Sequence, residues 1–237
     1  MRTVIQPDAR RDLYPVGTVV HSRVQDLQGG YARDDARAVA ELARLRKGAG
    51  KEPGDTPDLW GLTYRPETDF AVFERAPSGT AEEHAETAIH LALTLFALHQ
   101  QSHRDRPMHS PSPLGDQHQR IANRDLGWAV RRLMPAGEVD ERLRQRFVHL
   151  CTASTNASLA VRLRGIVQLL RREAVPLDYG LLADQLMWFQ RPGGPSKIRR
   201  TWGRSFVTYR PPEGQKSGQG AAPDATDADT NADTTSE

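Results

Sequence analysis

Apolar positions in the second half of the chain recur every three or four residues. One set falls within residues 138 to 152 and a longer set within residues 158 to 174. In each set the apolar side chains share one side of a helix: Val139, Leu143, Phe147 and Leu150 in the first, and Leu159, Leu163, Ile166, Val167 and Leu170 in the second. This period predicts two amphipathic helices, each packed on one side against a core.

Three further helices are predicted around these two. Residues 116 to 134 contain the helical pattern RDLGWAVRRLM, and Asp178 is a suitable cap for a helix running to Gln190. A last, basic helix has apolar residues every four positions, at Ile198, Trp202 and Phe206. We expect the side chains of Trp60, Trp128 and Trp202 to lie in the core.

The first half predicts two long helices separated by a loop. Residues 31 to 47 form one helix with a basic end, and the Pro- and Gly-rich residues 48 to 80 form a loop with short structured pieces around Trp60 and residues 70 to 73. Thr80 and Glu83 then have the spacing of a capping box ahead of LALTLFALHQQS. A helix this apolar on most of its circumference lies inside a bundle.

The fold class predicted is therefore all-α, because no alternating strand pattern of useful length occurs. We expect an N-terminal helical bundle over residues 1–115, a C-terminal helical bundle over 116–210 and a tail over 211–237. The tail is poor in apolar residues and rich in Gly, Ala, Asp and Thr, which predicts disorder.

Location and redox chemistry follow from what the sequence lacks. The longest apolar run, residues 88 to 98, is too short for a membrane span of roughly 20 residues, and the N-terminus has no signal-peptide pattern, so the cytoplasm is the expected location and no membrane partner is expected. Cys151 is the only cysteine, which excludes an internal disulfide and a multi-thiolate zinc site.

Charge is distributed unevenly along the chain. Residues 1–98 contain 12 basic and 15 acidic residues, whereas residues 99–210 contain 19 and 9, a net charge of +10, and the tail has a net charge of −5. Of the 32 basic residues 28 are Arg, whose planar fork of donors suits phosphate. A GC-rich genome that encodes Arg in place of Lys would give the same excess.

Histidines offer one alternative chemistry. His99 and His103 are four residues apart, at the spacing of two metal ligands on one helix face, and His109 and His118 could add to them. However, no carboxylate or thiolate completes a known metal motif. We therefore expect no metal and no cofactor, with His99, Gln100 and Gln101 satisfying buried groups of the following loop.

Catalytic motifs are also incomplete. The sequence HRD at residues 103 to 105 starts like a kinase catalytic loop but lacks the downstream Asn, the Gly-rich loop and the Asp-Phe-Gly motif. Cys151 lies beside the apolar face of its helix, where a small core residue is expected. No catalytic residue is predicted.

Arginines form a more regular pattern than the histidines. Arg142 and Arg146 are four residues apart and lie away from the apolar face of their helix, and Arg162 and Arg164 flank Leu163 on the next. No acidic residue occurs between Glu141 and Glu173. Repeated basic faces suit a phosphate backbone, although a single charged helix face is more often only solvated.

Several segments, taken in order, resemble one known family. These are AELARLRKGAGKEPGDTPDLW, AIHLALTLFALHQQS, DLGWAVRRL, ERLRQRFVHLCTASTNASLAVRLRGIVQLLRREAVPLDYGLLADQLMWFQRP and TWGRSFV. Over roughly residues 31 to 210 the chain is similar to the CasB-type small subunit of the type I-E CRISPR surveillance complex, Cascade.

The resemblance implies a non-catalytic protein of two small helical bundles, present twice in its complex. It implies as partners the other Cascade subunits, a second copy of the chain, the guide RNA and the target DNA. Family members line the belly of the assembly beside the guide RNA backbone and help hold the displaced non-target strand when the R-loop opens.

Carried over by position, the resemblance assigns nucleic-acid binding to seven residues: Arg46, Lys47, Arg142, Arg146, Arg162, Arg164 and Arg191. Two departures affect this assignment. The segment CTASTN, residues 151 to 156, has no basic residue where some members carry Arg, and the acidic residues 211–237 are not a family feature. Two other hypotheses stay open: a helical DNA-binding regulator that reads a major groove as a dimer, and a metal-dependent hydrolase built on the four histidines.

Overall fold

The computed structural model describes residues 13–112, 124–135 and 137–209. Within these ranges the chain is helical, with only an isolated bridge between His109 and Leu177, which confirms the all-α class. The longer helices are α1 (Pro15–Ala32), α2 (Ala36–Leu45), α5 (Thr80–Gln100), α6 (Leu126–Arg132), α7 (Glu141–Cys151), α8 (Asn156–Arg172), α9 (Tyr179–Phe189) and α10 (Gly194–Thr208). The predicted disordered tail lies outside the described residues.

Short helical pieces connect α2 to α5, as the Pro- and Gly-rich composition predicts. They are η1 (Arg46–Gly48), η2 (Pro53–Asp55), η3 (Pro57–Leu59), α3 (Trp60–Thr63), α4 (Pro66–Asp69) and η4 (Phe70–Val72). Proline stands at the start of several of them, where its missing N–H costs no hydrogen bond.

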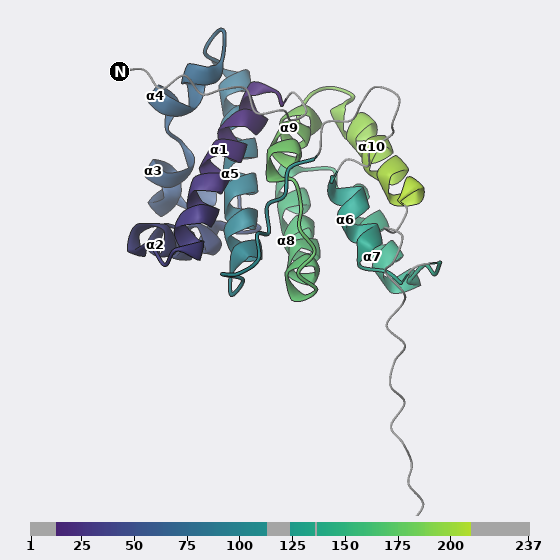
Figure 1. Cartoon of the computed structure of the whole chain (residues 1–237). Helices are drawn as coiled ribbons and strands as arrows, with labels where there is room; N and C mark the ends of the chain where they lie inside the picture. Colours follow the sequence, from purple (N-terminus) through teal and green to yellow (C-terminus); the bar gives the residue numbers. More distant parts are fainter. Residues whose placement is uncertain (1–12, 113–123, 136, 210–237) are drawn as a thin grey trace, which may run out of the picture.

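Helix α5 is the centre of the molecule. Every residue from Ala88 to Gln100 is buried, and α1, α2, α8 and α9 pack around the helix, which confirms its predicted place inside a bundle. Helices α2, α3 and α4 lie on one side of α5, and α6, α7 and α10 lie on the other (Figure 1). Among the described residues, no helix combines the length and apolar character needed to cross a bilayer.

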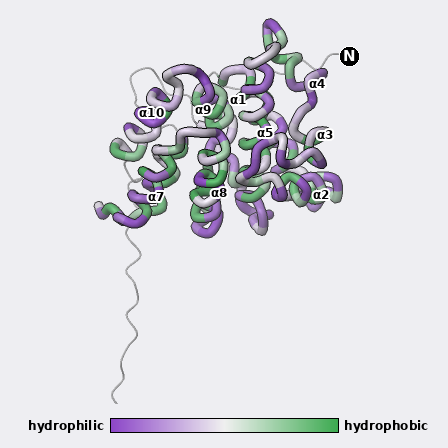
Figure 2. Tube along the Cα trace, turned by 180° about the vertical axis from the view of Figure 1, so that it is seen from behind, coloured by the Kyte–Doolittle hydropathy of each residue, from purple (hydrophilic) through white to green (hydrophobic). Residues whose placement is uncertain are grey.

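Buried residues from both halves of the chain form one hydrophobic cluster. Helices α8 and α9, from the second half, pack directly on α5 from the first. Figure 2 shows hydrophilic and hydrophobic residues following one another along α7 and α8, as expected for amphipathic helices. The division into bundles at residue 115 stays a prediction.

Side-chain caps set several helix starts. The carboxylate of Asp178 accepts a hydrogen bond from the Leu181 N–H at 3.0 Å, which confirms the predicted cap of α9. The predicted capping box at Thr80 is wrong: Thr80 is already helical, and the capping position is Gly79, whose φ of 57° favours glycine.

Residues 31 to 47 do not form one helix, contrary to the prediction. Helix α1 ends at Ala32, Asp34 has a left-handed φ of 59°, and α2 starts after Asp35. The Asp35 carboxylate accepts hydrogen bonds from two N–H groups of the first turn of α2, at 2.8 and 3.0 Å. This local cap competes with helix continuation and explains the break.

Helix α1 itself was not predicted. Its N-terminus has no cap from its own side chains, and instead Asp184 of α9 accepts hydrogen bonds from the N–H groups of Tyr14 (2.9 Å) and Gly17 (2.7 Å). Gly17 is required here, because a Cβ would lie 2.4 Å from a carboxylate oxygen of Asp184. The start of α1 is therefore fixed by a tertiary contact.

Two apolar residues are not where the pattern placed them. Val139 precedes the cap of α7 and is 53% exposed, and Trp60 is 52% exposed, so the core prediction is wrong for both. Trp202 is fully buried and donates its indole N–H to Gln185 Oε1 at 2.7 Å. Trp128 is also buried, as predicted.

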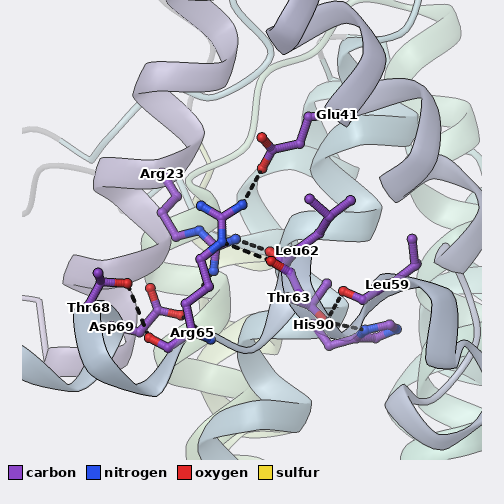
Figure 3. Close-up of polar contacts among 10 residues, drawn as sticks. Arg23, Glu41, Leu59, Leu62, Thr63, Arg65, Thr68, Asp69 and His90 are labelled. Carbon is purple, nitrogen blue, oxygen red and sulfur yellow. Dashed lines mark hydrogen bonds and ion pairs between the residues drawn. The ribbon is translucent and has the colours of Figure 1, made fainter.

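A buried polar network joins α1, α2 and the α3–α4 segment (Figure 3). Arg23 forms an ion pair with Asp69 at 3.0 Å, with both side chains largely buried, and Arg65 pairs with Glu41 at 2.9 Å. Burial lowers the pKa of Arg23 and raises the pKa of Asp69, while each opposite charge counteracts the other's shift. Both arginines therefore stabilise the packing of α1 and α2 on the α3–α4 segment.

Candidate nucleic-acid interface

The α7–α8 pair presents its basic residues as the helix pattern predicts. Asp140 caps α7 by accepting hydrogen bonds from the N–H groups of Arg142 (2.8 Å) and Leu143 (3.0 Å). Phe147 and Leu150 of α7 are buried, whereas Arg142 and Arg146 are exposed beside this apolar face. The two guanidinium groups are thus accessible to a polyanion.

Arg162 is half-buried, and its guanidinium group forms hydrogen bonds with other residues of the chain. It donates to the carbonyl oxygen of His149 and, at 3.0 Å, to the hydroxyl group of Thr152. These contacts hold the second turn of α8 to the end of α7. The positive charge of Arg162 contributes to the local electrostatic potential. However, one of its guanidinium nitrogens, Nη1, already donates hydrogen bonds within the chain.

Arg164 brings the first half of the chain into the same region. Its stem covers Gly50, where a Cβ would lie 2.9 Å from Arg164 Cδ, and Gly50 has a φ of +83°. The segment that carries Arg46 and Lys47 therefore lies against the middle of α8. Lys47 and Arg164 are exposed, and Arg46 is half-buried.

A second arginine group, beside Arg46, includes a residue that sequence reasoning missed. Arg46 and Arg104 line one small pocket together with Gln101, and Arg171 of α8 donates to Gln101 Oε1 at 3.2 Å. Arg104 also forms an ion pair with Asp34 and lies over the ring of Tyr31. Arg104 lies four residues after the end of the buried helix α5, and this position in the sequence could have indicated that it lies near Gln101.

Arg191 lies by the start of α5, whereas Arg46 lies by its end. The neighbouring Gln190 donates to the His84 carbonyl group at the start of α5 (2.9 Å) and accepts from Asn156 at the start of α8 (3.1 Å). Arg171, in contrast, lies by the other end of both helices. The seven predicted residues therefore form separate groups, and the Arg191 guanidinium group packs over the Trp188 ring, 4.2 Å from its centre.

Electrostatics supports a phosphate partner most clearly at α7 and α8. Across residues 13–112, 124–135 and 137–209, no acidic side chain forms an ion pair with Arg142, Arg146 or Arg164. Arg144, on the same helix, is neutralised by Glu141 through two hydrogen bonds. Uncompensated guanidinium groups bind phosphate without sequence preference.

The histidines do not form a metal site in the described residues. His99 Nδ1 bonds the Tyr179 hydroxyl group at 2.9 Å, and His103 Nε2 bonds the Arg171 carbonyl group at 2.9 Å. In the part of the chain that the structure describes, no group of three or more His, Cys, Asp or Glu residues could hold a metal ion. His118 lies outside that part.

Gln100 has the structural role that was predicted for His99, Gln100 and Gln101, whereas His99 bonds Tyr179 and Gln101 bonds Arg171. The Gln100 side chain donates to the carbonyl groups of His103 and Arg106 and accepts from the Met108 N–H at 3.0 Å, all in the loop after α5.

Cys151 is unsuited to nucleophilic chemistry, because burial raises the pKa of its thiol to about 11.

Comparison with known proteins gives a consistent result. A family model described as CRISPR-associated protein Cse2 matches residues 41–206. The crystal structure of CasB from Thermobifida fusca is 50% identical, covers 82% of this chain and 99% of its own, and superimposes with a TM-score of 0.69. A chain of a CRISPR RNA-guided surveillance complex, 18% identical, shares the fold with a TM-score of 0.56 and covers 81% of this chain and 93% of its own. No curated protein sequence matches.

Proposed function

This chain belongs to the CRISPR-associated Cse2 family, and we propose that it stabilises the R-loop of a type I-E surveillance complex by binding nucleic-acid backbones. Family membership makes it a structural, non-enzymatic subunit of the Cascade complex. In the proposal, its partners within the complex are the guide RNA, the displaced strand of the target DNA, the other subunits and a second copy of the chain. The expected location stays the cytoplasm.

The observation that carries the proposal is the set of uncompensated arginines on α7 and α8. Arg142, Arg146 and Arg164 are exposed on helices whose other sides are anchored in the core. Such groups contact phosphates whatever the base sequence, which a guide-directed complex requires because its target changes with each guide.

The energetics of strand exchange make modest contacts sufficient. An R-loop replaces one duplex by another of nearly equal stability, so a few backbone contacts tip the balance. A hydrogen bond to a charged group contributes about 1.5 kcal/mol or more, which corresponds to roughly tenfold in an equilibrium constant. Arg46 and Lys47, beside Arg164, add to the same surface in this proposal, and Arg191 acts at a separate place.

Charge reversal tests the proposal. The double variant Arg142→Glu/Arg164→Glu in a guide-loaded complex should shorten the R-loop lifetime on target DNA by roughly tenfold or more. The matched control is Arg37→Glu/Arg75→Glu, which makes the same change in net charge at exposed arginines outside α7 and α8. Circular dichroism of each purified variant checks that the helical fold is intact.

Equal lifetimes for the two double variants would contradict the assignment to α7 and α8. If, in addition, selection from random duplexes yielded one preferred sequence bound without guide RNA, the DNA-binding regulator predicted as an alternative would take its place.

A further inference from the structure

Aromatic and basic side chains gather at the turn between α9 and α10. The Arg191 guanidinium group lies 4.2 Å from the centre of the Trp188 ring, and the Lys197 ammonium group lies 4.7 Å from it. The Tyr14 ring packs edge-on against Trp188, with 5.8 Å between ring centres and an interplanar angle of 68°. We call these four residues the Trp188 cluster.

The cluster is accessible from solvent. Tyr14 is 60% exposed, which is unusual for a large aromatic side chain, and Arg191 and Lys197 are exposed as well. Trp188 is half-buried beneath them. A ligand at this place would meet the Tyr14 ring and two cations at once.

Backbone contacts hold the cluster in a fixed geometry. The Tyr14 N–H donates to Asp184 at 2.9 Å, which ties the start of α1 to α9. In the turn, the Gly194 N–H donates to the Arg191 carbonyl group at 2.8 Å, and a Cβ at Gly194 would lie 1.9 Å from the Trp188 carbonyl oxygen. Only glycine fits there, so α10 starts close against the end of α9.

The charge around the cluster is positive. Residues 185–209 contain five basic residues and no acidic one. Asp184, four residues before Trp188, is 4% exposed and bonded to backbone N–H groups, and Asp12, two residues before Tyr14, lies outside the described residues. Among the described residues, no acidic side chain forms an ion pair with Arg191 or Lys197. The field favours an anionic ligand.

An exposed ring beside two cations matches the chemistry of a single nucleic-acid strand. Such a strand offers both a base face for stacking and phosphates for ion pairing, and single-strand-binding proteins combine these contacts. In a duplex the base faces are stacked inside the helix, so a duplex would use the cations alone.

We propose that the Trp188 cluster is a binding site for single-stranded nucleic acid, in which a base stacks on Tyr14 and the flanking phosphates bind Arg191 and Lys197. The inference rests on the proposed function and refines it by adding a stacking contact at the end of the molecule away from Arg171. RNA and DNA single strands share this chemistry.

The test uses the purified full-length chain with fluorescent probes of about 12 nucleotides, within the site sizes of single-strand binders. The probes are oligothymidylate, oligouridylate and a DNA duplex, and anisotropy gives each dissociation constant over a range of salt concentrations. Tyr14→Ala should weaken single-strand binding about tenfold and leave duplex binding unchanged, because only stacking is lost. Lys197→Ala should reduce the salt slope for single strands by about 0.7.

Two variants separate the ring's role from general effects. Trp60→Ala removes another exposed aromatic ring, one with no cation packed on it among the described residues, and should leave single-strand binding unchanged. Tyr14→Phe keeps the ring and should recover most of the affinity lost in Tyr14→Ala. The stronger of the two single-stranded probes identifies the source, RNA or DNA.

Wild-type affinity of Tyr14→Ala for both single strands would overturn the inference. If Arg142→Glu/Arg164→Glu still shortened the R-loop lifetime in that case, the proposed function would stand without the stacking contact. Failure of the wild-type chain to bind either single strand, together with an unchanged R-loop lifetime, would contradict both.

Discussion

Two buried histidines make the stability of this fold sensitive to acid. His90 and His99 lie within α5 and are fully buried. Burial lowers the pKa of His90 to about 4 and that of His99 to about 3, because a charged imidazolium would lose its hydration inside the bundle. In the unfolded chain both groups return to the ordinary value of 6.5.

The sign and size of the effect follow from proton binding. Between pH 6.5 and these lowered values the unfolded chain binds protons that the folded chain does not, so acid stabilises the unfolded state. Above pH 6.5 both imidazoles are neutral in the folded and the unfolded chain, and their burial does not reduce the free energy of unfolding. As the pH falls below 6.5, the unfolded chain gains protons and the free energy of unfolding decreases. From pH 7 to pH 5 each histidine should cost about 2 kcal/mol of folding free energy.

Urea unfolding followed by circular dichroism at pH 7 and pH 5 measures this loss for the wild type, His90→Gln and His99→Gln. Each variant should show a pH dependence smaller by about 2 kcal/mol, whatever its absolute stability. The raised pKa values of Asp69 and Glu86 act in the opposite direction, but they are common to all three proteins and cancel in the comparison. An unchanged pH dependence in His99→Gln would refute the reasoning.

Three further predictions concern packing, capping and the thiol. Gly127→Ala should destabilise the fold by about 3 kcal/mol, because the new Cβ would lie 1.9 Å from the Trp202 carbonyl oxygen. Gly165→Ala, in open space on α8, should stabilise the fold by about 0.5 kcal/mol. Urea midpoints measure both effects, and equal effects would contradict the close packing at Gly127. Asp178→Ala should lower the free energy of unfolding by about 2 kcal/mol, because the Asp178 carboxylate accepts hydrogen bonds from the N–H groups of Leu181 and Ser112 at 3.0 and 2.7 Å. In the same urea experiment, a loss of less than about 0.5 kcal/mol, as for an exposed substitution, would contradict the role of Asp178 as a cap. With its pKa raised to about 11, Cys151 should react with a thiol reagent at pH 8 roughly 100-fold more slowly than in the urea-unfolded chain, and equal rates would contradict its burial.

Periodicity predicted the helices whose apolar faces meet the core. Leu159, Leu163 and Leu170 are buried on one side of α8, as their spacing indicates. Helix α1 carried the same signal, with Val16, Val20 and Val24 four residues apart, but its glycines and β-branched residues lower helix propensity. Its cap, Asp184, is 167 residues from Gly17 in sequence, so no local pattern marks where the helix starts.

The candidate site was predictable as helix faces but not as a surface. Spacing alone placed Arg142 and Arg146 on the exposed side of α7, where they lie. It could not show that the Arg162 guanidinium group bonds the end of α7, nor that Gly50, three residues after Lys47, packs against Arg164. The Trp188 cluster joins Tyr14 to Lys197 across the whole chain, and only the packing of α1 on α9 brings its members together.

The lifetime of the R-loop shows whether this chain stabilises the opened target DNA. A guide-loaded surveillance complex is reconstituted with and without this chain, and its dwell time on matched target DNA is measured for single molecules at fixed salt concentration. Our account predicts that omission of the chain shortens the dwell time while guide RNA stays bound, because backbone contacts to the opened strands are lost. An equal dwell time with and without the chain, in complexes shown to contain it, would contradict the account.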